Sequence, residues 1–186
     1  MISQWIFPQT VLRRLCAGAL AAAAFALPAL AWQSEVVFSS KQWQVEIVAW
    51  DDGGLGCQAK VDNGASSFSL WTFQDGSVQL QFHSPQWDFG DSGSSDLQLQ
   101  IDRKPIWNLT NAELYRNSVL FTLPDSDDGG RFILEVAQGN RLFLRNSSGG
   151  AVQDYSLAGS RASIEALLEC GDVITQQSTK ASNPFN

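Results

Sequence analysis

Histidine, methionine, cysteine and basic side chains are all scarce in this 186-residue sequence. One histidine, one methionine and three cysteines leave few ligands for metal or redox centres. Lys and Arg total 12 against 19 Asp and Glu, a formal net charge of −7. Nucleic acids and anionic lipids are bound through basic surfaces, so neither is an expected partner. We expect no cofactor and no metal, and a negative surface favours cationic partners.

One long apolar run lies near the start of the chain. Leu15–Leu30 is rich in alanine, follows Arg13 and Arg14, and ends in the small-x-small pattern of a cleavage site. A membrane anchor is the alternative, but a spanning helix needs about 20 strongly apolar residues. We predict a signal peptide over residues 1–31, cleaved near Ala31. The product would be periplasmic or secreted, without membrane insertion, and would carry 10 basic and 19 acidic side chains.

Cleavage would leave two cysteines, Cys57 and Cys170. An even number of cysteines in an oxidising compartment usually pairs as disulfides. A bond between them closes a loop worth up to ~4–5 kcal/mol in the chain-entropy description. A reactive thiol is the alternative, but the chain has no C-x-x-C motif, and only His83 could activate a thiol. We therefore predict a structural disulfide.

Apolar and polar residues alternate with a period of two from Val36 to Leu157, which is typical of strands. The clearest hairpin joins residues 67–73 to 77–83 around Asp75-Gly76, a dipeptide that suits a two-residue type I′ turn. That turn places Phe73 opposite Val78, Trp71 opposite Leu80 and Ser69 opposite Phe82 on one apolar face, with Phe68 and Leu70 on the wetter face.

A second hairpin is predicted over residues 131–146, with a three-residue loop at 138–140. The preceding Asp125 to Gly130 are interpreted as a turn. The hairpin stacks Phe132, Leu134 and Val136 with Leu142 and Leu144, and brings Glu135 near Arg141 and Arg145.

The period then changes to that of a helix. Ser160 is expected to cap a helix from Arg161 to Cys170, which Gly171 ends. We predict a mainly β domain over residues 32–174, followed by a flexible tail, 175–186. The domain is an antiparallel β-sandwich or curled sheet of about nine strands with one C-terminal helix.

Candidate catalytic residues are sparse. A catalytic triad would need His83, but no nucleophile-elbow motif is present. Aspartates cluster at Asp51 and Asp52, at Asp88, Asp91 and Asp96, and at Asp125, Asp127 and Asp128. Asp beside Gly is ordinary turn chemistry, and none of the clusters has the ligand spacing of an EF-hand. A weak calcium site and a glycosidase pair of carboxylates stay open as minor alternatives.

The loop that contains Trp87, Asp88 and Phe89 is the candidate contact for a ligand or partner. An aromatic side chain in a polar loop can stack on a sugar or anchor a protein. The alternative is a lid whose aromatic side chains cover the end of the sheet. Trp43, Trp50 and Trp71 fit strand patterns and are expected in the core.

Three short motifs occur in order along the chain: Trp43-x-Val45, Gly56-Cys57, and Tyr155-Ser-Leu-Ala-Gly-Ser160 before an Ala/Leu helix. This pattern resembles the invasion-associated locus B family and related periplasmic proteins of alphaproteobacteria. The family's Leu-x-Gly-x-x-x-Ala-x-x-x-Leu segment is matched by Leu157, Gly159, Ser163 in place of Ala, and Leu167. The resemblance spans roughly residues 43–170. It implies an envelope protein linked to host interaction or stress, and it carries over no catalytic residue.

These features together predict an exported, non-enzymatic β-domain that binds a protein or an envelope component. The prediction depends on the export signal, the disulfide, the acidic surface and the sparse catalytic residues. The alternative is a carbohydrate-binding module that uses the loop aromatic side chains.

Overall fold

The computed structural model describes residues 33–180, so the predicted signal peptide and Trp32 lie outside the described range. Ten strands form one antiparallel sheet in the order β1-β2-β3-β4-β5-β8-β7-β6-β9-β10. The strands are β1 Gln33–Ser40, β2 Trp43–Ala49, β3 Leu55–Asp62, β4 Ser67–Phe73, β5 Val78–His83, β6 Gly93–Ile101, β7 Trp107–Tyr115, β8 Ser118–Thr122, β9 Arg141–Asn146 and β10 Ala151–Ser156; the helices are α1 Asp127–Gln138 and α2 Ser160–Lys180. The predicted mainly β, antiparallel fold with a C-terminal helix is confirmed.

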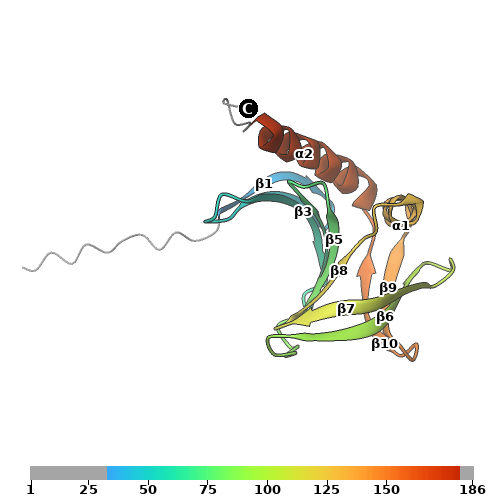
Figure 1. Cartoon of the computed structure of the whole chain (residues 1–186). Helices are drawn as coiled ribbons and strands as arrows, with labels where there is room; N and C mark the ends of the chain where they lie inside the picture. The colour runs from blue at the N-terminus through green and yellow to red at the C-terminus, as the bar shows by residue number, and fades with distance from the viewer. Residues whose placement is uncertain (1–32, 181–186) are drawn as a thin grey trace, which may run out of the picture.

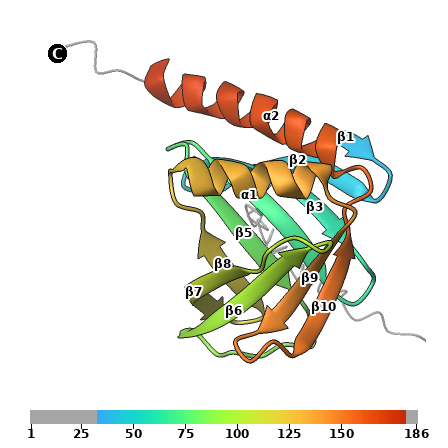
Figure 2. The ribbon, with the colours of Figure 1, turned by 90° about the vertical axis from the view of Figure 1, so that its right-hand side faces the viewer.

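The sheet curls on itself, so that β1–β5 face β6, β7, β9 and β10 across the core (Figure 1). Figure 2 shows α1 and α2 lying across one end of these two layers. Aromatic rings join the layers, because Tyr155 of β10 lies 5.9 Å from both Phe68 and Phe82. The Tyr155 hydroxyl lies 3.0 Å from Ser66 Oγ, and burial raises the pKa of Tyr155 to about 12.

The hairpin of β4 and β5 forms where it was predicted, but in a different register. The loop holds three residues, because the Phe73 amide donates to the Ser77 carbonyl and Gly76 takes a φ of 82°. A shift of one residue moves every side chain to the other face. Phe68 and Leu70 are therefore in the core, paired with Phe82 and Leu80, and Trp71 is on the opposite face.

Residues 127–138 form helix α1, so the hairpin predicted over 131–146 is wrong in its first half, as is the turn assigned to Asp125–Gly130. Phe132 and Val136 are buried one helical turn apart, whereas Leu134 between them is 59% exposed. Glu135 does not approach the arginines of β9, because its carboxylate accepts a hydrogen bond from Trp107 Nε1 at 3.0 Å.

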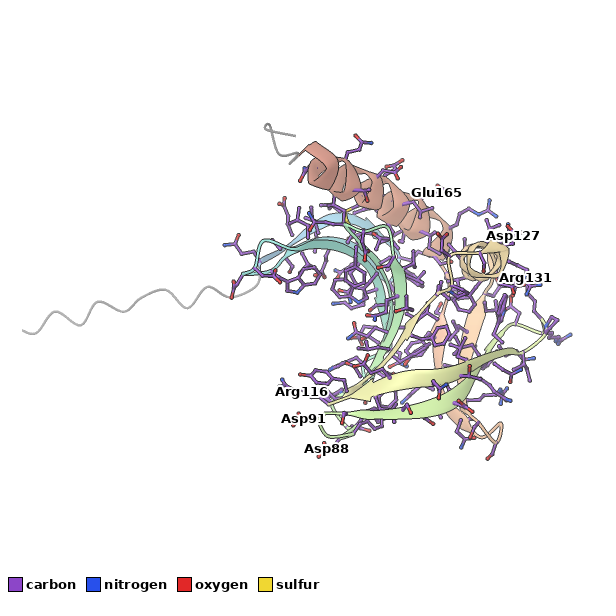
Figure 3. The ribbon with its side chains drawn as sticks, in the orientation of Figure 1. Asp88, Asp91, Arg116, Asp127, Arg131 and Glu165 are labelled. Atoms are coloured by element: carbon purple, nitrogen blue, oxygen red, sulfur yellow. A yellow bond between two sulfur atoms is a disulfide. The ribbon has the colours of Figure 1, made fainter. Side chains whose placement is uncertain are left out.

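The sequence around α1 supports a helix in two further ways. Asp127 and Asp128 lie in the first turn, where the helix dipole favours negative charge. Arg131, labelled in Figure 3, lies 4.5 Å over the Trp107 ring and pairs with Asp128 at 3.0 Å. These contacts hold the helix against β7.

Helix α2 is longer than predicted and does not stop at Gly171. A Cβ at Gly171 would lie 2.9 Å from Thr72 Oγ1, so the glycine permits close approach of the helix to β4. Ser160 does not cap the helix as expected; its hydroxyl donates instead to the Val136 carbonyl of α1. The helix includes residues 175–180 of the predicted tail, and residues 181–186 lie outside the described range.

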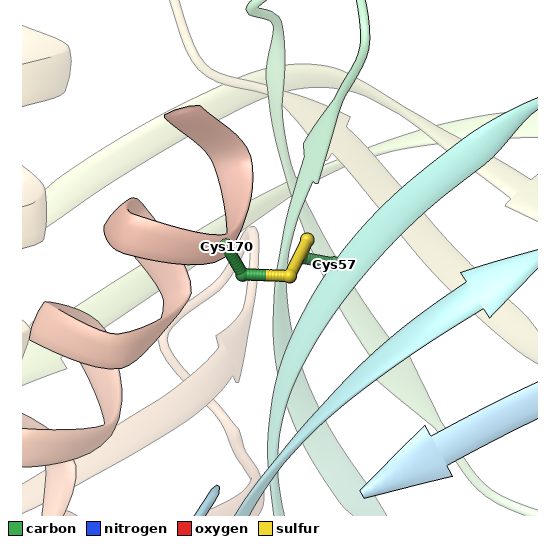
Figure 4. Close-up of a disulfide and its surroundings, with 2 residues drawn as sticks. All are labelled: Cys57 and Cys170. Carbon is green, nitrogen blue, oxygen red and sulfur yellow. A yellow bond between two sulfur atoms is a disulfide. The ribbon is translucent and has the colours of Figure 1, made fainter. Parts of the chain in front are cut away.

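The predicted disulfide between Cys57 and Cys170 is confirmed, with the two Cα atoms 6.1 Å apart. Figure 4 shows that it joins β3 to α2 directly. Within residues 33–180, neither helix is long and apolar enough to cross a membrane.

Candidate binding surface

Strands β2–β5 have two faces with different surroundings. Helix α2 packs over one face, on the outside of the arch that these strands form (Figure 1). No described helix or strand lies over the other, which we call the open face. By the strand register it consists of Gln44, Glu46, Val48, Gly56, Gln58, Lys60, Asp62, Ser67, Ser69, Trp71, Phe73, Gln79, Gln81 and His83.

Three aromatic rings gather on the open face near the turn between β2 and β3. Trp50 lies with its ring centroid 6.0 Å from that of Trp71 and 6.1 Å from that of Phe73. Gly56 makes room for this arrangement, because a Cβ there would lie 2.6 Å from the Trp50 ring. All three rings are half-buried, so each keeps part of its surface accessible to a ligand.

Hydrogen bonds between strands fix the polar side chains of the open face. Trp71 Nε1 donates to Gln81 Oε1 at 2.8 Å, and Gln81 Nε2 donates to Ser118 Oγ of β8 at 3.1 Å. Gln58 Nε2 donates to Ser69 Oγ at 2.8 Å. A network of this kind holds side chains in defined positions before a ligand arrives.

Other polar side chains of the same face are not engaged in such bonds. The side chains of Gln44, Gln79 and His83 make no hydrogen bond to any residue in the described range 33–180. Each amide offers donors and an acceptor, and the imidazole offers one of each when neutral. These groups are therefore free to bind a ligand.

The charges of this face largely cancel through one ion pair between β2 and β3. Lys60 Nζ lies 3.6 Å from Glu46 Oε1, and the two side chains are only 32% and 12% exposed. The remaining charged side chain, Asp62, lies at the end of β3, where its carboxylate accepts a hydrogen bond from the Gly64 amide. The middle of the open face is thus close to neutral, although the whole chain is acidic.

The loop predicted as a contact lies between β5 and β6. Trp87 and Phe89 are half-buried, with ring centroids 5.6 Å apart, and both pack against the core. Asp88 is exposed, and its carboxylate accepts a hydrogen bond from the Gly90 amide. The three predicted residues are therefore close together, in a loop that covers one end of the core.

Arg116 fixes this loop through its backbone, which exchanges two 2.6 Å hydrogen bonds with Phe89 and Gly90. Figure 3 shows Asp88, Asp91 and Arg116 at the same end of the molecule. Trp87 and these side chains line a hollow of about 390 Å³. The loop remains a predicted contact for a ligand.

The remaining predicted candidates lie apart from one another. Within residues 33–180, no three His, Cys, Asp or Glu side chains are grouped so that they could hold a metal ion. His83 lies on the open face between Ser67 and Ser118 in the strand register. Asp127 and Asp128 belong to the first turn of α1.

Comparisons with protein-family models, with curated proteins and with solved structures find no match to the chain. Sequence reasoning missed the open face because the incorrect hairpin register put Trp71 on the apolar side. The signal that could have found it is the series Gln58, Ser69, Gln79 and Gln81. These polar residues alternate with fully apolar neighbours on three successive strands.

Proposed function

We propose that the protein is an exported, non-enzymatic binding domain that holds a cell-envelope component on its open face. The observation that supports this is the combination of fixed aromatic and amide side chains with the free groups of Gln44, Gln79 and His83. Sites of this kind bind through a few placed polar groups beside apolar rings. Half-burial favours binding, because a side chain already ordered loses little entropy when a ligand arrives.

Export is part of the same proposal. The Cys57–Cys170 disulfide fits an oxidising compartment, and the apolar run before Ala31 fits a cleaved signal. The resemblance to the invasion-associated locus B family supports a place in the periplasm. Mass spectrometry of the exported protein would then find Trp32 at its N-terminus, and an intact leader would overturn this assignment.

His83 provides a direct test, because the chain contains one histidine. Diethyl pyrocarbonate modifies accessible imidazole groups, and mass spectrometry reads the extent at His83. We expect a soluble extract of bacterial cell envelope to protect His83. The Gln79→Arg variant should lose this protection, because a bulky charge then stands among the open-face side chains. Gln138→Arg, at an exposed position on α1, is the matched control and should retain it. Equal modification with and without extract would contradict the proposal.

A further inference from the structure

We infer that the ligand of the open face is a neutral glycan chain, an inference that rests on the proposed function of this surface. The first argument is charge. Glu46 and Lys60 pair with each other, so the face presents no uncompensated charge between β2 and β5 except at its Asp62 edge. A cationic or anionic ligand would gain little there, because electrostatic complementarity needs a net potential on the protein side.

The second argument is the chemical character of the side chains. The C–H faces of sugar rings are apolar, and the half-buried rings of Trp50, Trp71 and Phe73 offer matching surfaces. Sugar hydroxyl groups both donate and accept hydrogen bonds, as the free amides of Gln44 and Gln79 do. The ligand that combines both properties without charge is a neutral carbohydrate.

The third argument is what the open face lacks as a protein interface. Exposed large apolar side chains among the described residues lie on other elements: Val36, Val37 and Phe38 on β1, Tyr115 and Val152 on β7 and β10, Leu134, Leu168 and Val173 on the helices, and Ile106 before β7. Strands β2–β5 have none. A protein interface of standard size buries a large contact area to which many exposed apolar side chains contribute. This surface therefore suits a polyhydroxylated chain better than a folded partner.

The size of the surface indicates that the ligand contains more than one sugar unit. Gln44 lies on β2, and Gln79 and His83 lie on β5, three strand spacings away. Neighbouring strands lie about 4.8 Å apart, so the free groups span roughly 14 Å across the sheet. A single sugar ring cannot reach both sides, whereas an oligosaccharide lying across the strands can.

The experiment titrates the disulfide-bonded domain with neutral hexasaccharides of glucose and of N-acetylglucosamine, followed by tryptophan fluorescence and calorimetry. We expect saturable binding to at least one of them, with the same affinity at low and high salt, because no charge pair forms. Gln79→Ala and His83→Ala should each weaken binding about tenfold, since each removes a free, half-buried hydrogen-bonding group of the open face. Gln138→Ala is the matched control and should bind like the parent protein.

Each contrary result has a defined meaning. Glycan binding that Trp87→Ala abolishes and Gln79→Ala leaves intact would overturn the inference and move the site to the β5–β6 loop. Protection of His83 by envelope extract without binding to any neutral hexasaccharide would overturn the glycan assignment and leave the proposed function standing. Salt-sensitive protection by polylysine would instead assign a cationic ligand. No protection by any of these would contradict both proposals.

Discussion

The two faces of strands β2–β5 are built from alternate residues of the same chain segments, yet they differ in almost every property. On the face under α2, Val45, Ala59, Leu70 and Leu80 are at most 1% exposed. On the open face, amides, hydroxyls and half-buried rings form hydrogen-bonded rows. Burying apolar surface supplies most of the folding free energy, so the covered face can stabilise the domain. On the open face, Val48, Gln58, Ser67 and Ser69 are also buried. The side chains available for recognition there are the half-buried rings and the free groups of Gln44, Gln79 and His83.

The sharpest contrast should come from two substitutions on adjacent strands. Phe68 lies 5.0 Å from Phe82 and 6.0 Å from Trp43, so Phe68→Ala should lower the free energy of unfolding by about 3–5 kcal/mol. Gln79→Ala, on the open face, should change it by no more than about 0.5 kcal/mol. Urea unfolding measures both. Equal losses would show that the two faces do not divide stability and binding as described.

The disulfide should have the next largest effect. Replacing Cys57 and Cys170 together with serine should cost roughly 2–5 kcal/mol, because the long loop between them is no longer closed in the unfolded chain. Helix α2 should loosen first, so protease should cut after Leu157 while the β-type circular dichroism spectrum persists. If thiol reagents label both cysteines readily in the native oxidised protein, the bond is absent and this account fails.

The close contact between α2 and the face of the strands beneath it can be tested by adding one methyl group at Gly171. Gly→Ala in a helix interior usually stabilises by up to about 1 kcal/mol. At Gly171 we expect the opposite sign and a loss of about 1–3 kcal/mol, because the new methyl group would meet Thr72 Oγ1 at 2.9 Å. Thr72→Ala removes that oxygen, which is buried without a hydrogen-bond partner, and should restore part of the loss. A double-mutant cycle without coupling would contradict this contact.

The strands could be predicted because their sequence signal is local, and the disulfide because few cysteine pairings are possible. Alternation over a few residues identifies a strand, and two remaining cysteines leave one possible pair. Helix α1 was missed because the alternation of Phe132, Leu134 and Val136 also fits a strand. Only the packing in the folded domain shows that Phe132 and Val136 are buried while Leu134 is exposed. Its anchor, the contact between Trp107 and Glu135, joins segments far apart in sequence.

Predicting which residues form the open face required the loop length of one turn, and amino-acid composition does not determine that length. Asp75-Gly76 suits both a two-residue loop and a three-residue loop with glycine in the left-handed conformation. Choosing the first left Leu80 and Phe82 of β5 on the apolar face, where they are, but reversed the faces of β4 and so placed Trp71 in the core. The length of α2 was missed for a related reason. Gly171 was interpreted as the end of the helix, whereas a glycine is needed there because α2 lies close to Thr72.

Asp75 lies in that turn, and its substitution should have the smallest effect on stability among these predictions. Its Oδ1 accepts a hydrogen bond from the Ser77 amide at 2.9 Å. Hydrogen bonds from the Ser77 side chain and backbone lower the pKa of Asp75 below its usual value of 3.8. The carboxylate therefore stabilises the folded hairpin fully above the unfolded pKa, and this contribution is lost as the pH falls through the folded pKa.

Because Asp75 is exposed, we expect the loss to stay below about 1 kcal/mol, and Asp75→Asn to reduce the difference in stability between pH 7 and acid by that amount. Carboxyl-carbon NMR should find the pKa of Asp75 below 3.8. A pKa of Asp75 at or above 3.8 would show that the hydrogen bonds do not hold the three-residue loop. The register that sends Trp71 to the open face would then have to be fixed by the packing of Phe68 and Leu70 alone.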